Sequence, residues 1–297
     1  MFNLPTMPTI SSNSIISVLK ILKFKKMVEK SFINPPRTKK LKVPKYIANT
    51  FNLTACEIIQ HAVITIQPKQ NCGNSHVLFF HGGAYLLEGN TMHWKIVENI
   101  ALNANCRVSY IDYPLAPENT YKVTFDMVQK SFDKLTTDFP DNKFIFMGDS
   151  AGGGLALAFA QKLFYERGLI QPIKLVLFSP WLDLSMQHPG AKKQVELDFI
   201  LPLDGLIQAG LKYAGGDDVM QYLLSPINGE LKGLGETMVF YGTHELFYPD
   251  CLKLKNMATD SSNFHFQEFE GMQHDWVIFP ISEAKQALKM AVEFINS

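Results

Sequence analysis

Short apolar runs alternate with longer amphipathic stretches from residue 55 onward. The runs have the length and composition of buried strands, and the stretches between them have helical spacing. The predicted strands are 58–59 and 62–66, which form an opening hairpin, and then 77–80, 107–111, 144–147, 175–178, 238–241 and 264–266. The predicted helices are 91–103, 120–138, 151–167, 250–258 and 282–296. This order predicts an α/β fold, a mostly parallel central sheet with helices on both faces.

Two segments depart from this alternation. Residues 15–28 place apolar side chains at near-helical spacing with lysines on the other faces. Residues 184–224 hold a helix-like run at 203–213 and fit no strand–helix repeat. We interpret the chain, 1–297, as a single α/β domain with two additions over the strand ends. These are an N-terminal cap segment, 1–46, and a cap insertion, 184–224.

Composition supports one large globular domain. Of the 297 residues 46% are hydrophobic, and the 28 basic residues balance the 28 acidic ones, so nothing predicts a nucleic-acid partner. The balance hides an asymmetry, because residues 1–46 hold ten basic residues and the single acid Glu29. The helix at 15–28 either packs its apolar stripe on the protein or makes weak lipid-surface contact through residues 15–46, and we favour packing.

Cysteine usage and hydropathy bear on the compartment. Cys56, Cys72, Cys106 and Cys251 lack the close spacing of a zinc site and the density of a disulfide scaffold. No apolar run approaches the roughly 18 to 20 residues of a membrane span, and no signal peptide is recognisable. We therefore expect a cytoplasmic protein with no integral membrane segment and no metal. The sequence leaves a homodimer open.

The motif G-D-S-A-G at 148–152 stands between a predicted strand and a predicted helix, which is the context that G-x-S-x-G requires. Glycines flank the serine because side chains would collide in so tight a turn. The turn presents the Ser150 hydroxyl at a helix N-terminus, where developing negative charge is stabilised. Ser150 is the predicted nucleophile.

The loop His81-Gly82-Gly83 directly follows the predicted strand before it. Acyl transfer requires backbone N–H groups placed in advance for the oxyanion of the tetrahedral intermediate. We assign this role to the N–H groups of Gly82, Gly83 and Ala151. His81 is a rival for the catalytic base, but its loop supplies the oxyanion donors. We therefore predict that it holds the loop by hydrogen bonds.

Two further segments, D-Y-P-L-A-P-E at 112–118 and S-P-W-L-D at 179–183, accompany the H-G-G-A loop and the G-D-S-A-G-G elbow. Together they resemble the hormone-sensitive-lipase-like branch of the α/β-hydrolases, which includes bacterial esterases and arylacetamide-deacetylase-like enzymes. The resemblance spans roughly residues 74–280. It implies hydrolysis of carboxylic esters, often short-chain, without a cofactor and under a cap built partly from the N-terminus.

The histidine and the acid of a hydrolase triad follow the serine in the order acid, then histidine. His274 lies in a loop just beyond the last predicted strand and is the predicted base, whereas its rival His265 lies within that strand. The loop after the preceding strand offers two acids. Glu245 matches the family position and is the predicted acid, and Asp250 resembles a first-turn residue of the next helix.

The sequence thus predicts a serine carboxylesterase whose substrates are small-molecule esters with short to medium acyl chains. Hydrolysis would proceed through a catalytic triad and an acyl-enzyme intermediate. Tyr85, Trp181 and Trp276 are candidates for the substrate pocket, because aromatic walls suit apolar substrates, although core positions explain them equally well. Three alternatives stay open: a small-molecule-binding protein on a hydrolase scaffold, an interfacial lipase, and an amidase or deacetylase.

Overall fold

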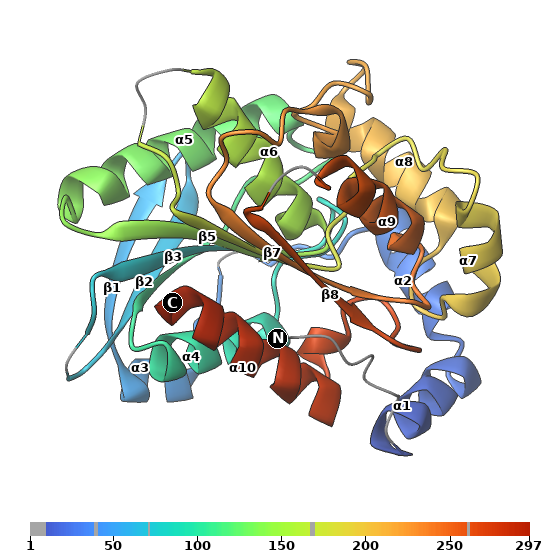
Figure 1. Ribbon diagram of the computed structural model, residues 1–297, viewed down its shortest axis with the longest axis horizontal. Coiled ribbons are helices and arrows are strands. Elements are labelled where there is room, and N and C mark those ends of the chain that lie inside the picture. Colours follow the sequence, from blue (N-terminus) through green and yellow to red (C-terminus); the bar gives the residue numbers. More distant parts are fainter. Residues whose placement is uncertain (1–9, 39–40, 71, 167–169, 260–261) are drawn as a thin grey trace.

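A twisted central sheet carries the fold (Figure 1). The structure, a computed structural model, describes residues 10–38, 41–70, 72–166, 170–259 and 262–297. In the described part of the chain the sheet has eight strands in the order β1-β2-β4-β3-β5-β6-β7-β8. They span Phe51–Ile58 (β1), His61–Pro68 (β2), Ser75–Phe80 (β3), Arg107–Ile111 (β4), Lys143–Asp149 (β5), Lys174–Phe178 (β6), Glu236–Gly242 (β7) and Phe264–Phe269 (β8).

Strand direction agrees with the sequence prediction. β2 is antiparallel to both of its neighbours, and every other neighbouring pair is parallel. The predicted hairpin is confirmed, but β1 begins earlier, at Phe51, than its short apolar run indicates. Its side chains are mostly exposed or half-buried, so most of the strand carries no continuous apolar signal. The predicted mostly parallel α/β sheet is confirmed.

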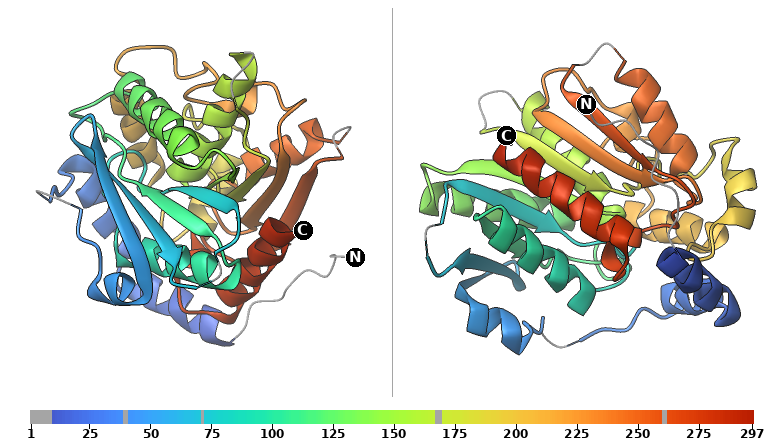
Figure 2. Two further views of the ribbon diagram at one scale, coloured as in Figure 1. Left: turned by 90° about the vertical axis from the view of Figure 1, so that its left-hand side faces the viewer. Right: turned by 60° about the horizontal axis from the view of Figure 1, so that its bottom comes forward.

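Helices cover both faces of the sheet (Figures 1 and 2). α3 (Lys45–Thr50), α4 (Thr91–Asn103) and α10 (Ser282–Asn296) lie on one face, and α5 (Tyr121–Asp138) and α6 (Ala151–Tyr165) lie on the other. Each layer buries its own hydrophobic cluster against the strands. Between α6 and α10 along the chain lie α7 (Ala191–Leu197), α8 (Leu203–Ala214) and α9 (Tyr248–Met257).

The N-terminal segment differs from its prediction. Instead of one helix over 15–28, it forms α1 (Ile10–Ile21) and α2 (Phe24–Ile33). Lys23 between them has a left-handed backbone, with φ 51°, which stops helix propagation. The predicted apolar stripe is divided as a result: Leu19 is buried, whereas Leu22 is exposed.

The segment that interrupts the alternation contains α7 and α8. α8 coincides with the helix-like run expected at 203–213 and packs against α2. Figure 1 shows α7 and α8 at the end of the sheet where β5 to β7 terminate. Within the described ranges, no helix is long and apolar enough to cross a membrane.

Candidate active site

Ser150 occupies a strained turn between β5 and α6. Its backbone has φ 51° and ψ −119°, outside the regions that non-glycine residues ordinarily adopt. The flanking glycines are required by close contacts. A Cβ at Gly152 would overlap the carbonyl oxygen of Phe80, and a Cβ at Gly148 would overlap Gly152. The turn therefore forms only with small residues on both sides of the serine.

Hydrogen bonds from the neighbouring strand fix this turn. The Ser150 N–H donates to the Phe178 carbonyl at 2.8 Å, and the Trp181 N–H donates to the Ser150 carbonyl at 2.9 Å. Both partners lie at or just beyond the end of β6. The serine backbone is therefore held in place by the sheet, which positions its hydroxyl above the strand ends.

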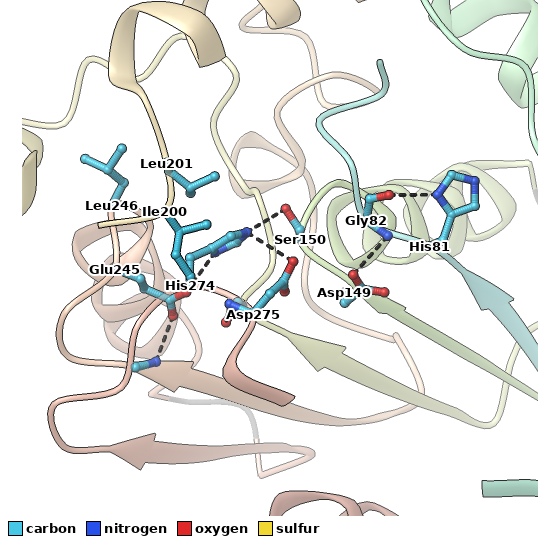
Figure 3. Close-up of polar contacts among 12 residues, drawn as sticks. His81, Gly82, Asp149, Ser150, Ile200, Leu201, Glu245, Leu246, His274 and Asp275 are labelled. Carbon is cyan, nitrogen blue, oxygen red and sulfur yellow. Dashed lines mark hydrogen bonds and ion pairs between the residues drawn. The ribbon is translucent and has the colours of Figure 1, made fainter. Parts of the chain in front are cut away.

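His274 and Glu245 converge on the serine from two other loops (Figure 3). His274 Nε2 lies 2.8 Å from Ser150 Oγ, and His274 Nδ1 lies 3.0 Å from Glu245 Oε2. The other carboxylate oxygen, Oε1, accepts the Gly242 N–H at 2.7 Å. All three side chains are buried. The structure thus brings together the serine, histidine and acid that the sequence singled out.

These contacts fix the histidine tautomer. An ionised carboxylate only accepts hydrogen bonds, so Glu245 holds the proton on Nδ1 of His274. When the imidazole is neutral, Nε2 is therefore unprotonated and accepts the hydrogen bond of the Ser150 hydroxyl. This is the arrangement in which a histidine removes a proton from a serine.

Asp275 is a third group around the imidazole that the sequence analysis missed. Its Oδ2 lies 3.3 Å from His274 Nε2, and its left-handed backbone, φ 53°, turns the side chain toward the site (Figure 3). Burial lowers the pKa of His274, but the carboxylates of Asp275 and Glu245 outweigh burial and hold that pKa well above its usual value. The sequence signal that could have identified Asp275 is its position directly after the predicted catalytic histidine.

Asp198, which precedes α8, links the interrupting segment to the acid loop. Its Oδ1 accepts hydrogen bonds from the N–H groups of Ile200 and Leu201, at 2.7 and 2.8 Å. Its Oδ2 accepts one from the Leu246 N–H at 2.8 Å. The carboxylate is fully buried and also faces His274 electrostatically. Nothing in the local sequence indicates this role, because Leu246 is 48 positions away.

The oxyanion loop differs from its prediction at one donor. The Gly82 N–H donates to Asp149 Oδ2 at 3.0 Å (Figure 3), so it already has an acceptor. The same oxygen lies 3.2 Å from His93 Nε2, which fastens α4 to the elbow. In the described part of the chain, no acceptor is found for the N–H groups of Gly83 and Ala151. Two of the three assigned donors are therefore available.

His81 has the structural role expected for it. Its Nδ1 lies 2.7 Å from the Gly82 carbonyl, and its ring stacks on Tyr113 with centroids 4.4 Å apart. Burial and the neighbouring His93 lower the pKa of His81 to about 4, so it is neutral at neutral pH. Figure 3 shows its ring turned away from Ser150.

The two rival residues lie elsewhere. His265 is on β8, half exposed, with Nε2 2.9 Å from Glu236 Oε2. Asp250 lies in the first turn of α9, as expected. Burial and the nearby Asp183 carboxylate raise the pKa of Asp250 to about 7. His274 is hydrogen-bonded by Glu245 instead.

The three aromatic pocket candidates fall into two groups. Tyr85 and Trp181 are buried and stack at 5.8 Å, and Tyr85 also stacks on Tyr213 of α8 at 3.8 Å. Both lie in the core layer that contains α6, near the elbow. Trp276 instead packs on Phe269, at 4.4 Å, in the opposite layer. Trp181 is also tied to the elbow directly, because its N–H donates to the Ser150 carbonyl.

A cavity of about 340 Å³ adjoins the site. Its walls come from the oxyanion loop, the histidine loop, α4 and the segment that contains α2, and they are formed by Ser31, Pro36, Thr38, Gly82, Gly83, Leu87, Glu88, Gly89, Asn90, His93, Asp275 and Ile278. No cluster of three metal-ligating side chains occurs among the residues described.

Comparisons with known proteins identify the family of the chain and similar structures. A family model described as alpha/beta hydrolase fold matches residues 77–278. The chain is 31% identical over 227 residues to an esterase of Acinetobacter venetianus, covering 74% of each protein. It is 29% identical to esterase LipU of Mycobacterium tuberculosis, covering 74% of this chain and 77% of LipU. A hormone-sensitive lipase from a metagenome library has a similar structure, with a TM-score of 0.81, 25% identity and 99% coverage of both chains.

Proposed function

Because the chain belongs to the alpha/beta hydrolase family and is an enzyme of its esterase and lipase class, we propose that it is a serine carboxylesterase acting through Ser150, His274 and Glu245. The line of hydrogen bonds from Glu245 through His274 to Ser150 carries this proposal.

In the first half of the proposed reaction, Ser150 Oγ attacks the ester carbonyl carbon and its proton passes to His274 Nε2. Glu245 stabilises the imidazolium. The carbonyl oxygen becomes an oxyanion that accepts the N–H groups of Gly83 and Ala151. The bond to the alcohol oxygen then breaks, and the alcohol leaves with the proton from His274.

In the second half, water attacks the acyl carbon and gives its proton to His274. The bond to Ser150 Oγ breaks, the carboxylic acid leaves, and the serine regains its proton. Gly82 joins the oxyanion donors only when its N–H leaves the Asp149 carboxylate. This dependence makes Asp149 part of the support of the site.

The cavity beside the oxyanion loop supports small substrates. Its volume of about 340 Å³ is near the lower end of the range for ligand pockets, about 300–1,000 Å³. We expect kcat/KM on p-nitrophenyl esters to be highest for acyl chains of about two to six carbons and to fall at least tenfold, as a rough estimate, by twelve carbons. Steady-state kinetics from acetate to palmitate measures this. Activity that rises steeply only above the solubility of a long-chain ester would favour the interfacial lipase instead.

We further propose that residues 1–46 and 184–224 form a cap over the site. Lys25 Nζ donates to the carbonyls of Val195 and Asp198, which joins α2 to the segment around α7. The Arg37 guanidinium, farther along, pairs with Glu118 Oε2 at 2.7 Å. The Lys25 contacts join the two segments, and the Arg37 ion pair ties the N-terminal segment to the rest of the protein, which supports a cap made from both segments. A cytoplasmic location and a homodimer stay predictions from the sequence.

Replacing Asp275 by asparagine is expected to extend activity to lower pH. The base works only when His274 is neutral, so wild-type activity falls as the pH drops through the raised pKa of His274. Glu245 and Asp198 also face the imidazole and remain in the variant. Removing the third carboxylate lowers the pKa of His274, so the acid limb of the kcat/KM profile should move to lower pH.

The matched control for this profile is Asp133→Asn, which removes an exposed carboxylate on α5. Its acid limb should coincide with that of the wild type. If the acid limb of the Asp275→Asn profile stays in place or moves to higher pH, Asp275 does not stabilise the imidazolium of His274.

A further inference from the structure

Exposed apolar side chains are concentrated on α1 and α2. Five of the thirteen large exposed hydrophobic residues found in the described chain lie on these two helices or in the turn between them, within 16 positions, each between 50% and 78% exposed. They are Val18, Ile21, Leu22, Met27 and Ile33. Single exposed apolar residues are ordinary in proteins, whereas large exposed apolar patches mark interaction sites.

These side chains are exposed although both helices are anchored to the protein. Leu19 of α1 and Phe32 of α2 are buried in the core cluster that contains α6, and Phe24 packs against the same cluster. Lys212 Nζ of α8 also donates to the Phe32 carbonyl at 3.3 Å. The helices therefore use other side chains to hold their position, and the five apolar residues face outward.

Basic residues lie between the apolar ones. Lys20, Lys23, Lys26 and Lys30 are exposed, and Glu29 is the only acid on the two helices. Within the described ranges, no carboxylate lies within ion-pair distance of the last three lysines. Lys20 Nζ lies over the ring of Phe199, 4.2 Å from its centroid. We call Lys23, Lys26, Lys30 and the five apolar residues the α1–α2 surface.

The α1–α2 surface lies next to the cavity beside the active site. Ser31, at the end of α2, and Pro36, just beyond it, line that cavity together with Gly83 and Asp275. Figures 1 and 2 show α1 and α2 at one side of the molecule, and α2 packs against α8. Whatever binds the α1–α2 surface is therefore brought close to the opening of the cavity.

We propose that the α1–α2 surface docks on a lipid bilayer that carries anionic phospholipids. Exposed apolar side chains interleaved with lysines are the pattern of interfacial helices, in which the apolar groups enter the boundary of the acyl chains and the lysines meet anionic headgroups. Charge complementarity selects this occupant, because the α1–α2 surface carries three exposed lysines and the two helices hold a single acid, Glu29. Docking would present the cavity to apolar esters dissolved in the membrane, a consequence that rests on the proposed function.

The experiment is flotation of the full chain with extruded vesicles of phosphatidylcholine alone or with about one third phosphatidylglycerol, at low salt and at about 0.5 M salt. We expect binding to the anionic vesicles, weaker binding to the neutral ones, and loss of the difference at high salt. The double variant Lys26→Gln, Met27→Ser should lower the partition coefficient on anionic vesicles by about tenfold or more.

The chain offers a matched control. Lys255→Gln, Met257→Ser removes the same two residue types from α9, where Met257 is 45% exposed and Met27 is 55% exposed. This variant should bind vesicles like the wild type. Hydrolysis of dissolved p-nitrophenyl butyrate should be unchanged in both variants, which shows that they are folded.

Three results would overturn the docking proposal. In the first, the wild type does not float with anionic vesicles; in the second, both double variants lose binding equally. In the third, the wild type is a dimer in solution that Lys26→Gln, Met27→Ser dissociates, which would make the α1–α2 surface an interface between two copies. Flotation does not depend on turnover, so an inactive wild type that still binds vesicles would contradict the proposed function and leave docking supported.

Discussion

Ser150→Ala is expected to lower kcat on p-nitrophenyl butyrate by about 10⁴- to 10⁶-fold. The variant keeps the oxyanion donors and the cavity but has no nucleophile that His274 could activate. The elbow should still form, because alanine removes only the hydroxyl and the glycines on both sides remain. Thermal unfolding that matches the wild type would show that the loss is chemical.

A fluorophosphonate probe gives an independent measurement on the same residue. It should modify the wild type at Ser150 and leave Ser150→Ala unmodified, because only an activated serine attacks the phosphorus. Ser150→Ala activity within about tenfold of the wild type would contradict the proposed nucleophile. A wild type inert to the probe and to every ester would favour the small-molecule-binding protein.

Glu245→Gln is expected to lower kcat by about 10⁴-fold while binding changes little. The reason is the Gly242 N–H, which donates to one oxygen of Glu245. In the variant the Gly242 N–H keeps its hydrogen bond by donating to the amide oxygen of the glutamine, so the amide NH₂ group faces Nδ1 of His274. Nδ1 must then accept, the imidazole proton moves to Nε2, and Nε2 no longer accepts the proton of Ser150.

Asp250→Asn is the matched control for this variant, since it makes the same chemical change five positions along the chain. It should retain activity within about threefold, because His274 is held by Glu245 and Asp250 lies in α9. Steady-state kinetics of the two variants side by side measures the difference. Loss of activity in Asp250→Asn with retention in Glu245→Gln would reverse the assignment of the acid.

Three acids from separate segments surround one imidazole in this site. Glu245 orients Nδ1, Asp275 lies beside Nε2, and Asp198 fixes the loop that carries Glu245. Together they favour the charged form of His274, which is the form that the reaction produces after the serine attacks. The expected consequence is an esterase that works best above neutral pH, consistent with the raised pKa of His274.

The sequence by itself determined the parts of this protein that depend on a few neighbouring residues. The elbow around Ser150 is one, because its shape follows from the flanking glycines and from a strand that runs directly into a helix. The helix over 91–103 and the strand over 107–111 are others, since both were predicted with the boundaries that the structure has. Hydrophobic periodicity fixes such elements locally.

Only the tertiary structure decided contacts between distant segments. The Gly82 N–H meets Asp149 across 67 positions, and Asp198 meets Leu246 across 48. Glu245 rather than Asp250 contacts His274 because α9 begins between the two acids and carries Asp250 away. Such contacts depend on how the loops pack above the sheet, and the residues next to each partner in the chain do not encode that packing.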